Sequence, residues 1–398
     1  MTQSPMTRPP LPAAAALLLL ASCTAADNPS PTTVLRDSAG VLIAESPPEA
    51  SGQEWQLQQP PVIEIGQTDG AEDAPDLFGA ISQAIRLSGG NIAVADGLAR
   101  EIRVFDPAGS HLVTFGRPGE GPGEFVNLAS IAELPGDTIS AIDNLNGRAS
   151  LFTSAGAFVR SFPIPRIPGA SAPNVVGWLE DGTLLLQTRS RPVSRDTRDQ
   201  ATHFLYAVDR HGEIIDTLGE FPGSRLGRNG LAFGFGSRAQ FAAGGDLAWV
   251  GHSSGFELVG HDRTGSVRRI VRLDRTPKAV TQEEIAESRA RAEKSLEGMS
   301  GPAVERILQT EFASAHPVHG MLMSGGTGSL WVERYRNDFA QDPGPGEWDI
   351  FDAEGTLTGH LTVPNELRIT DIGPEFVLGV HSDPLGVPTV RMYRLIRD

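Results

Sequence analysis

Four short apolar runs recur along this chain with the same turns between them, and this repeat limits the fold more than any other feature. The clearest copy spans Ile81–Phe125, where each run has the length of a strand and is bounded by Gly, Pro or Asp. Its third and fourth runs are joined by Asp106–Gly109 (DPAG), in which Pro presets φ and Gly takes a positive φ. Similar turns read TSAG, DRHG, DRTG and DAEG at Thr153–Gly156, Asp209–Gly212, Asp262–Gly265 and Asp352–Gly355. Each copy therefore predicts a four-stranded antiparallel meander.

The second strand of each copy sets the period. These strands are expected to begin at Ile92, Ile139, Leu184, Leu247, Leu330 and Val377. Repeats of about 40–50 residues that each form one sheet are typical of β-propellers. We therefore predict an all-β fold, a six-bladed β-propeller of four-stranded antiparallel blades over residues 55–398. Pro61–Gly66 is expected to close the last blade beside Val390–Ile396, which removes open sheet edges.

The segment Thr276–Pro317 carries the helical signal of the mature chain. Thr281 with Glu284 three residues later forms a capping box, and Pro302 suits the first turn of a second helix. Apolar residues at helical spacing follow both starts. We predict a small αα-hairpin, residues 276–317, inserted between blades four and five.

The long connections of the predicted propeller all belong to one class. Strands alternate in direction within a blade, so second-to-third loops and blade-to-blade links share one face, and the remaining turns share the other. The long segments of the first class are Thr188–Thr202, Gly219–Ser237, the helical insertion, Arg334–Gly346 and His381–Thr389. Neutral drift of loop lengths would scatter insertions over both faces, whereas binding surfaces are commonly built from loops on a rigid scaffold. We call this the loop-rich face and the opposite one the short-turn face.

Two stretches resemble known proteins. Ile102–Phe125 (IRVFDPAGSHLVTFGRPGEGPGEF) resembles an NHL repeat, the blade unit of NHL-type six-bladed propellers. Val34–Ser46 (VLRDSAGVLIAES) resembles the leader of bacterial lipid-anchored six-bladed propeller proteins. The resemblance implies the fold and not a function, because one fold hosts many functions. It also implies that Phe125 packs between two blades.

The N-terminus has the pattern of a lipoprotein signal peptide. Arg8 precedes the apolar run Leu11–Leu20, which is too short to span a bilayer. The run leads to Leu20–Cys23 (LASC), which resembles a lipobox, and Cys23 is the only cysteine of the chain. We predict a signal peptide over residues 1–22, and a lipidated Cys23, tether and leader over residues 23–54. The alternative is an ordinary signal peptide followed by an incidental thiol.

The location and the partners follow from the same features. By resemblance to Gram-negative lipoproteins, Thr24 after the lipidated cysteine favours the outer membrane, so we expect an exported protein anchored in the cell envelope. The formal net charge of −16 argues against nucleic acid and against electrostatic attachment to anionic lipid. We expect a monomer that touches the membrane only through its anchor.

Charged side chains occupy matched positions at the ends of second strands on the loop-rich face. They are Asp96, Asp143, Arg334 and His381, and a basic cluster that includes Arg189 and Arg191 lies nearby in the sequence. A mixed-sign ring of this kind would suit a polar or zwitterionic ligand. The alternative is that Asp96 and Asp143 cap turns through Asx hydrogen bonds and that the arginines are a solvated loop tip.

Two functions remain open from the sequence. The first is a non-enzymatic protein that binds a protein partner or a small polar ligand on the loop-rich face and needs no cofactor. The second is a metal-dependent hydrolase or lyase that resembles the six-bladed lactonases, which hold Ca²⁺ in the channel with Glu, Asn and Asp. Asn127 and Asn174 are the candidate residues for that calcium site, while His316 and His319 form only a weak metal signal.

Overall fold

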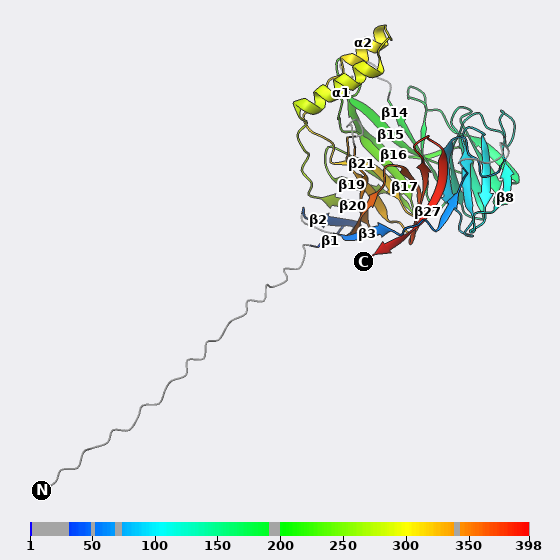
Figure 1. Ribbon diagram of the computed structural model, residues 1–398, viewed down its shortest axis with the longest axis horizontal. Helices are drawn as coiled ribbons and strands as arrows, with labels where there is room; N and C mark the ends of the chain where they lie inside the picture. The colour runs from blue at the N-terminus through cyan, green and yellow to red at the C-terminus, as the bar shows by residue number, and fades with distance from the viewer. Residues whose placement is uncertain (2–31, 49–51, 68–73, 191–199, 338–342, 398) are drawn as a thin grey trace.

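The computed structural model describes residues 1, 32–48, 52–67, 74–190, 200–337 and 343–397. Cys23 and Arg191, two of the residues singled out in the sequence, lie outside these ranges. Figure 1 shows a body made almost entirely of strands, with α1 and α2 at its top and the C-terminus at its bottom.

Three sheets consist of four antiparallel strands in chain order. The first sheet holds β5 (Ile81–Arg86), β6 (Ile92–Asp96), β7 (Glu101–Phe105) and β8 (His111–Phe115). The second holds β9 (Leu128–Leu134), β10 (Thr138–Asp143), β11 (Arg148–Thr153) and β12 (Phe158–Pro163). The third holds β13 (Asn174–Trp178), β14 (Leu184–Arg189), β15 (Gln200–Val208) and β16 (Ile214–Arg225).

A fourth sheet repeats this pattern and is widened by the leader. Its meander is β17 (Ala239–Gly244), β18 (Leu247–His252), β19 (Glu257–His261) and β20 (Val267–Leu273). The leader forms a hairpin of β1 (Val34–Ser38) and β2 (Val41–Ser46), and β2 pairs in parallel with β20. The hairpin therefore covers the outer edge of this sheet.

The remaining strands form one larger sheet. One meander is β21 (His319–Ser324), β22 (Leu330–Arg334), β23 (Gly346–Phe351) and β24 (Leu357–Val363). It continues into β25 (Leu367–Ile372), β26 (Phe376–Ser382) and β27 (Pro388–Arg397). β3 (Gln53–Leu57) pairs with both β24 and β27, and β4 (Ile63–Ile65) pairs antiparallel with β27. Repeated four-stranded antiparallel sheets of this kind are consistent with a β-propeller.

Apolar side chains fill the space between neighbouring sheets. One cluster joins Ile85 of the first sheet to Ile139 of the second. Phe125, on the link between these sheets, is fully buried in that cluster, which confirms the predicted packing. Trp249 and Trp331 are also buried in clusters that draw on more than one meander. Large aromatic rings therefore fill the wedges between sheets.

The helical insertion begins as the sequence predicts. α1 (Gln282–Ser295) has the capping box of Thr281 and Glu284, and α2 (Pro302–Leu308) begins with proline. Neither helix has a buried residue. The two ends of the insertion pair with each other, because Val280 N–H donates to Ser314 and a bridge joins Ala279 to Ala315. Of the helices described, none is long and apolar enough to cross a membrane.

One expected loop is partly a strand. Gly219–Ser237 was expected to be a long connection, but β16 extends through Arg225 and pairs with a correspondingly long β15. The pairing needs strands of matched length, and β15 provides this length because it begins early, at Gln200.

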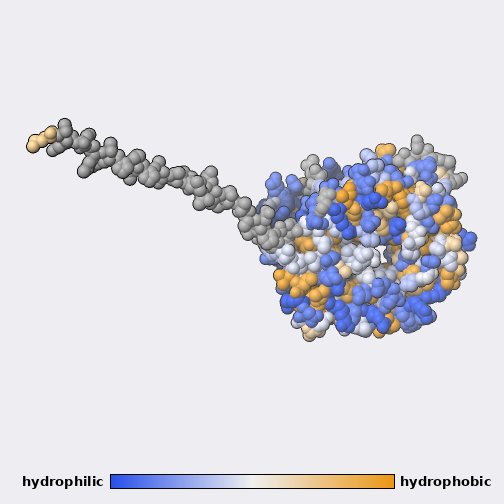
Figure 2. All heavy atoms as spheres, turned by 90° about the horizontal axis from the view of Figure 1, so that it is seen from below, coloured by the Kyte–Doolittle hydropathy of each residue, from blue (hydrophilic) through white to orange (hydrophobic). Residues whose placement is uncertain are grey.

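In Figure 2, the view from below, the molecule has a rounded outline that is hollowed near its middle.

Candidate functional site

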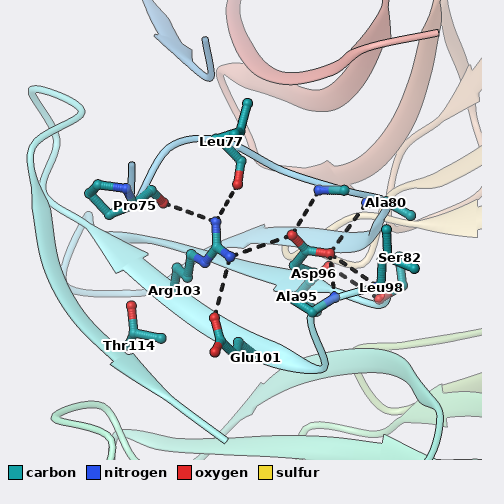
Figure 3. Close-up of polar contacts among 12 residues, drawn as sticks. Pro75, Leu77, Ala80, Ser82, Ala95, Asp96, Leu98, Glu101, Arg103 and Thr114 are labelled. Atoms are coloured by element: carbon teal, nitrogen blue, oxygen red, sulfur yellow. Dashed lines mark hydrogen bonds and ion pairs between the residues drawn. The ribbon is translucent and has the colours of Figure 1, made fainter. Parts of the chain in front are cut away.

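Asp96 is enclosed by backbone amides. Its side chain is 1% exposed and accepts hydrogen bonds from the N–H groups of Gly79, Ala80, Leu98 and Ala99 over 3.0–3.3 Å. Arg103 lies 3.6 Å from the carboxylate and donates to the carbonyl of Leu77 (Figure 3). Asp96 therefore ties the segment that enters β5 to the turn that follows β6.

Asp143 repeats this arrangement one sheet further on. It is fully buried and accepts from the N–H groups of Val126, Asn127 and Asn146 and from the side-chain amide of Asn146. Backbone amides reach the same strand-end position in both sheets, which is the turn-capping role that the sequence left open as an alternative. These contacts give both carboxylates a structural role at the loop-rich face.

The other predicted residues are not joined to these two. Among the described residues, no hydrogen bond or ion pair connects any two of Asp96, Asp143, Arg334 and His381. Arg189 ends β14 with an exposed side chain. His381 is half-buried in β26, and burial lowers the pKa of its imidazole. Asn174 donates to Gln187.

Arg334 lies at a cavity of about 430 Å³. The cavity is bounded by the link from β20 to α1, the segment that leads into β21, the end of β22 and the start of β23. Its lining includes Arg275, Lys278, Glu284, His316, Tyr335, Asn337 and Glu347. The helical insertion and the β22–β23 connection both contribute, so the cavity belongs to the loop-rich face.

A buried carboxylate contacts two arginines that line this cavity. Asp349 in β23 is 0% exposed, and its Oδ1 lies 2.9 Å from Arg334 Nε and 2.9 Å from His360 Nδ1. Its Oδ2 lies 2.7 Å from Arg275 Nη2. Burial alone would raise the pKa of Asp349, but the hydrogen bond from His360 and the charges of Arg275 and Arg334 outweigh it and hold the pKa at about 2. Asp349 is therefore a carboxylate at neutral pH.

The two arginines on Asp349 are bound in different ways. Arg334 donates to Asp349 and Glu347, and its Nη2 also lies 2.9 Å from His360 Nδ1. Arg275 approaches Asp349 Oδ2 closely, yet that oxygen has no hydrogen bond of acceptable geometry, and Arg275 Nη1 has no hydrogen-bond partner among the described residues. The guanidinium of Arg275 also lies 5.2 Å from the ring centre of Phe256. The guanidinium of Arg334 is therefore held by well-aligned hydrogen bonds, whereas that of Arg275 is held mainly by the charge of Asp349.

Arg275 and Arg334 also line a second cavity, of about 400 Å³. Its other lining residues include Pro48, Asp274 and His360. His360 Nε2 accepts a hydrogen bond from the backbone N–H of Gly52, so the leader lies close to this side of the cluster. Arg275 and Arg334 thus border two hollows of similar size.

A histidine and a carboxylate hold the helical insertion against the cavity. His316 Nε2 lies 2.9 Å from Glu284 Oε1, and the imidazole packs against Phe235 and Tyr335. Hydrogen bonds from Thr281 first, and then from His316, lower the pKa of Glu284. The other ring nitrogen, His316 Nδ1, is buried without a partner among the described residues. The pair therefore joins the first turn of α1 to the segment that leads into β21.

Sequence reasoning identified Arg334 but missed Arg275, Lys278 and Asp349. A signal existed for Asp349, because it stands in the otherwise apolar run Trp348–Phe351, and a buried charge must be paired. Arg275 and Lys278 stand at the start of the helical insertion, where basic residues carry no distinctive pattern. Within the described ranges, no three His, Cys, Asp or Glu side chains gather so that they could hold a metal ion.

No protein-family model and no curated protein matches this sequence. Among solved structures, the fold is similar to that of a Bacteroides fragilis protein described as exported, with a TM-score of 0.50 and 12% identity over 89% of this chain and 99% of that chain. It is also similar to a member of the DUF4221 family from Bacteroides vulgatus, with a TM-score of 0.50 and 10% identity over 93% and 100%. Virginiamycin B lyase from Staphylococcus aureus matches with a TM-score of 0.42 and 9% identity over 86% and 100%. At such identities these likenesses concern the fold alone.

Proposed function

We propose that this chain is an exported, lipid-anchored six-bladed propeller that binds a small polar ligand in the cavity beside Arg334. The observation that carries the proposal is the cavity itself, which is lined by charges of both signs and built from the long connections. Its volume of about 430 Å³ lies in the range of small-molecule sites, which run from about 300 to 1,000 Å³.

Strand pairing supports six blades. Five meanders of four strands follow one another from β5 to β24, and β25, β26 and β27 gain a fourth strand from β4. Ile65 faces Val390 in that pairing, so the start and the end of the domain meet in one sheet. A ring closed in this way has no open edge between its first and last blades. We place the propeller over residues 55–398, after the signal peptide (1–22) and the leader (23–54).

The proposed location depends on the N-terminal sequence. Cys23 follows a short apolar run at a lipobox-like position, and it is the only cysteine. One of the similar solved structures is of a protein described as exported. We propose that the anchor holds a monomer at the outer membrane and leaves the loop-rich face free.

The remaining predicted residues have supporting roles in this proposal. Asp96 and Asp143 brace the turns around the loop-rich face through their backbone hydrogen bonds. Arg334 orients Asp349 and Glu347 beside the ligand. Arg189 and Arg191 are proposed to contribute charge to the same face, and His381 a neutral imidazole.

A cavity-filling variant tests the binding function. Thr276 is exposed and lines the cavity, so Thr276→Trp should fill it without disturbing the core. The matched control is Ala108→Trp, at an exposed position of a turn on the short-turn face. A panel of small anionic, zwitterionic, cationic and neutral compounds would be screened by saturation-transfer difference NMR. We expect wild type and Ala108→Trp to bind at least one class and Thr276→Trp to bind none. Binding that survives in Thr276→Trp would contradict this site.

A further inference from the structure

We propose that the ligand of this cavity carries an anionic oxygen group, a carboxylate or a phosphate, which Arg275 and Lys278 bind. This inference rests on the proposed binding function and names the chemical class that the cavity selects. Guanidinium and ammonium groups are the usual protein partners of both anions.

Arg275 is the cation that an incoming anion can engage most easily. Asp349 retains two contacts from Arg334 and one from His360 when Arg275 turns away. Arg275 itself has one close contact, to Asp349 Oδ2, and that contact lacks hydrogen-bond geometry. Moving Arg275 toward a ligand therefore breaks no well-aligned hydrogen bond and leaves Asp349 paired with Arg334. Arg334 cannot do the same, because it already donates hydrogen bonds to Asp349 and Glu347.

Lys278 supplies the second positive charge. It lines the cavity with an exposed side chain, and its ammonium group makes no hydrogen bond or ion pair with the described residues. Its backbone carbonyl accepts from His316 N–H over 2.8 Å, so the pairing of the two ends of the insertion fixes where the lysine stands. Arg275 and Lys278 are separated by only two residues in the chain, and both line the same cavity.

The acidic groups around the cavity are already occupied. Glu284 Oε2 accepts from Thr281, and Glu284 Oε1 lies against His316. Asp349 is enclosed by Arg275, Arg334 and the imidazole of His360. Glu347 accepts from Arg334 and is the one half-exposed carboxylate in the lining, with a side-chain exposure of 54%. The uncommitted groups are therefore mainly hydrogen-bond donors, which complement an anion, and Glu347 remains to bind a hydroxyl or ammonium group of the same ligand.

Direct titration with simple anions tests the inference. The full mature chain would be titrated by calorimetry with succinate and with inorganic phosphate, using succinamide as the uncharged analogue and sodium chloride at matched ionic strength. We expect saturable binding of succinate, phosphate or both, and none of succinamide or chloride. Succinate alone would indicate a carboxylate ligand, and phosphate alone a phosphate ligand.

Charge variants locate the binding. Arg275→Gln and Lys278→Gln should each weaken binding about tenfold or more, as expected when a charged hydrogen bond is lost. Arg275→Lys keeps a cation beside Asp349 and should recover part of the affinity, which guards against a folding defect in Arg275→Gln. Lys294→Gln removes an exposed charge from the last turn of α1, outside the cavity lining, and should bind as wild type does.

The outcomes separate the two proposals. Equal binding by wild type and Arg275→Gln, or an equal loss in Lys294→Gln, would overturn the anion inference. The absence of saturable binding of both anions would also overturn it. If Thr276→Trp still abolishes the binding of a cationic or neutral compound in that case, the binding function stands and only the ligand class is wrong.

Discussion

Two buried carboxylates of this molecule are neutralised in opposite ways. Asp96, at the end of β6, accepts hydrogen bonds from four backbone amides and has one arginine nearby. Asp349, in β23, is enclosed by the side chains of Arg275, Arg334 and His360. Both are almost fully excluded from solvent, and two partners of Asp349, Arg275 and Arg334, line two cavities.

The two kinds of partner give the carboxylates different roles: Asp96 has a purely structural role, whereas the ion pairs of Asp349 can rearrange. Backbone amides cannot move without unfolding the turns that carry them, so the Asp96 arrangement fixes the path of the chain. Side-chain cations can exchange one anion for another within the folded state, so the Asp349 cluster can respond to a ligand. The Asp143 arrangement repeats the first type one sheet further on, so two sheets share it, and the Asp349 cluster differs from both.

The largest expected effect on stability comes from removing the buried charge of Asp349. Asp349→Asn leaves Arg275 and Arg334 without their shared counter-ion, and loss of one member of a buried ionic cluster typically costs about 3–5 kcal/mol. The free energy of unfolding, measured with urea, should fall by about this amount, and succinate or phosphate affinity should change as well. A variant as stable as wild type would show that the cluster contributes no net stability.

The pH dependence of stability should distinguish Asp349 from a half-buried carboxylate, Asp371. The folded-state pKa of Asp349 is about 2, below its usual value, so its contribution of about 2 kcal/mol is present above about pH 4 and is lost as the pH falls toward 2. Burial raises the pKa of Asp371 to about 6, so its ionised form is unfavourable at neutral pH and stability is gained as the pH falls through 6. Unfolding of wild type, Asp349→Asn and Asp371→Asn at pH 7, about 5 and about 3 would measure both. The same pH profile in all three proteins would contradict these assignments.

The smallest effect is expected at Asp96. In Asp96→Asn the amide oxygen can still accept from Ala80, Leu98 and Ala99, while the contacts of Oδ2 with Gly79 and Arg103 are lost. We expect a loss of about 1–2 kcal/mol in the free energy of unfolding. Anion affinity should stay at the wild-type value, because Asp96 does not line the cavity. A loss of affinity without a loss of stability would place Asp96 in the binding site instead.

Local rules account for much of the fold. The turns with Asp or Thr first and Gly last, the six second-strand starts and the capping box of Thr281 with Glu284 all depend on a few neighbouring residues, so the sequence is enough to predict them. The strand length of Gly219–Arg225 was missed, because it depends on a partner strand whose early start has no local signal.

The candidate site shows the same division. The sequence determined that the long connections belong to one class and that Arg334 ends a strand there, whereas the signal of Asp349, a charge within an apolar run, was missed. Only the tertiary structure decided that Arg275, Asp349 and His360, which come from three separate elements, share one buried cluster. A buried carboxylate is stable only when it is paired, so Asp349 needs partners from elsewhere in the chain. The packing of the sheets decides which cations are close enough to be those partners.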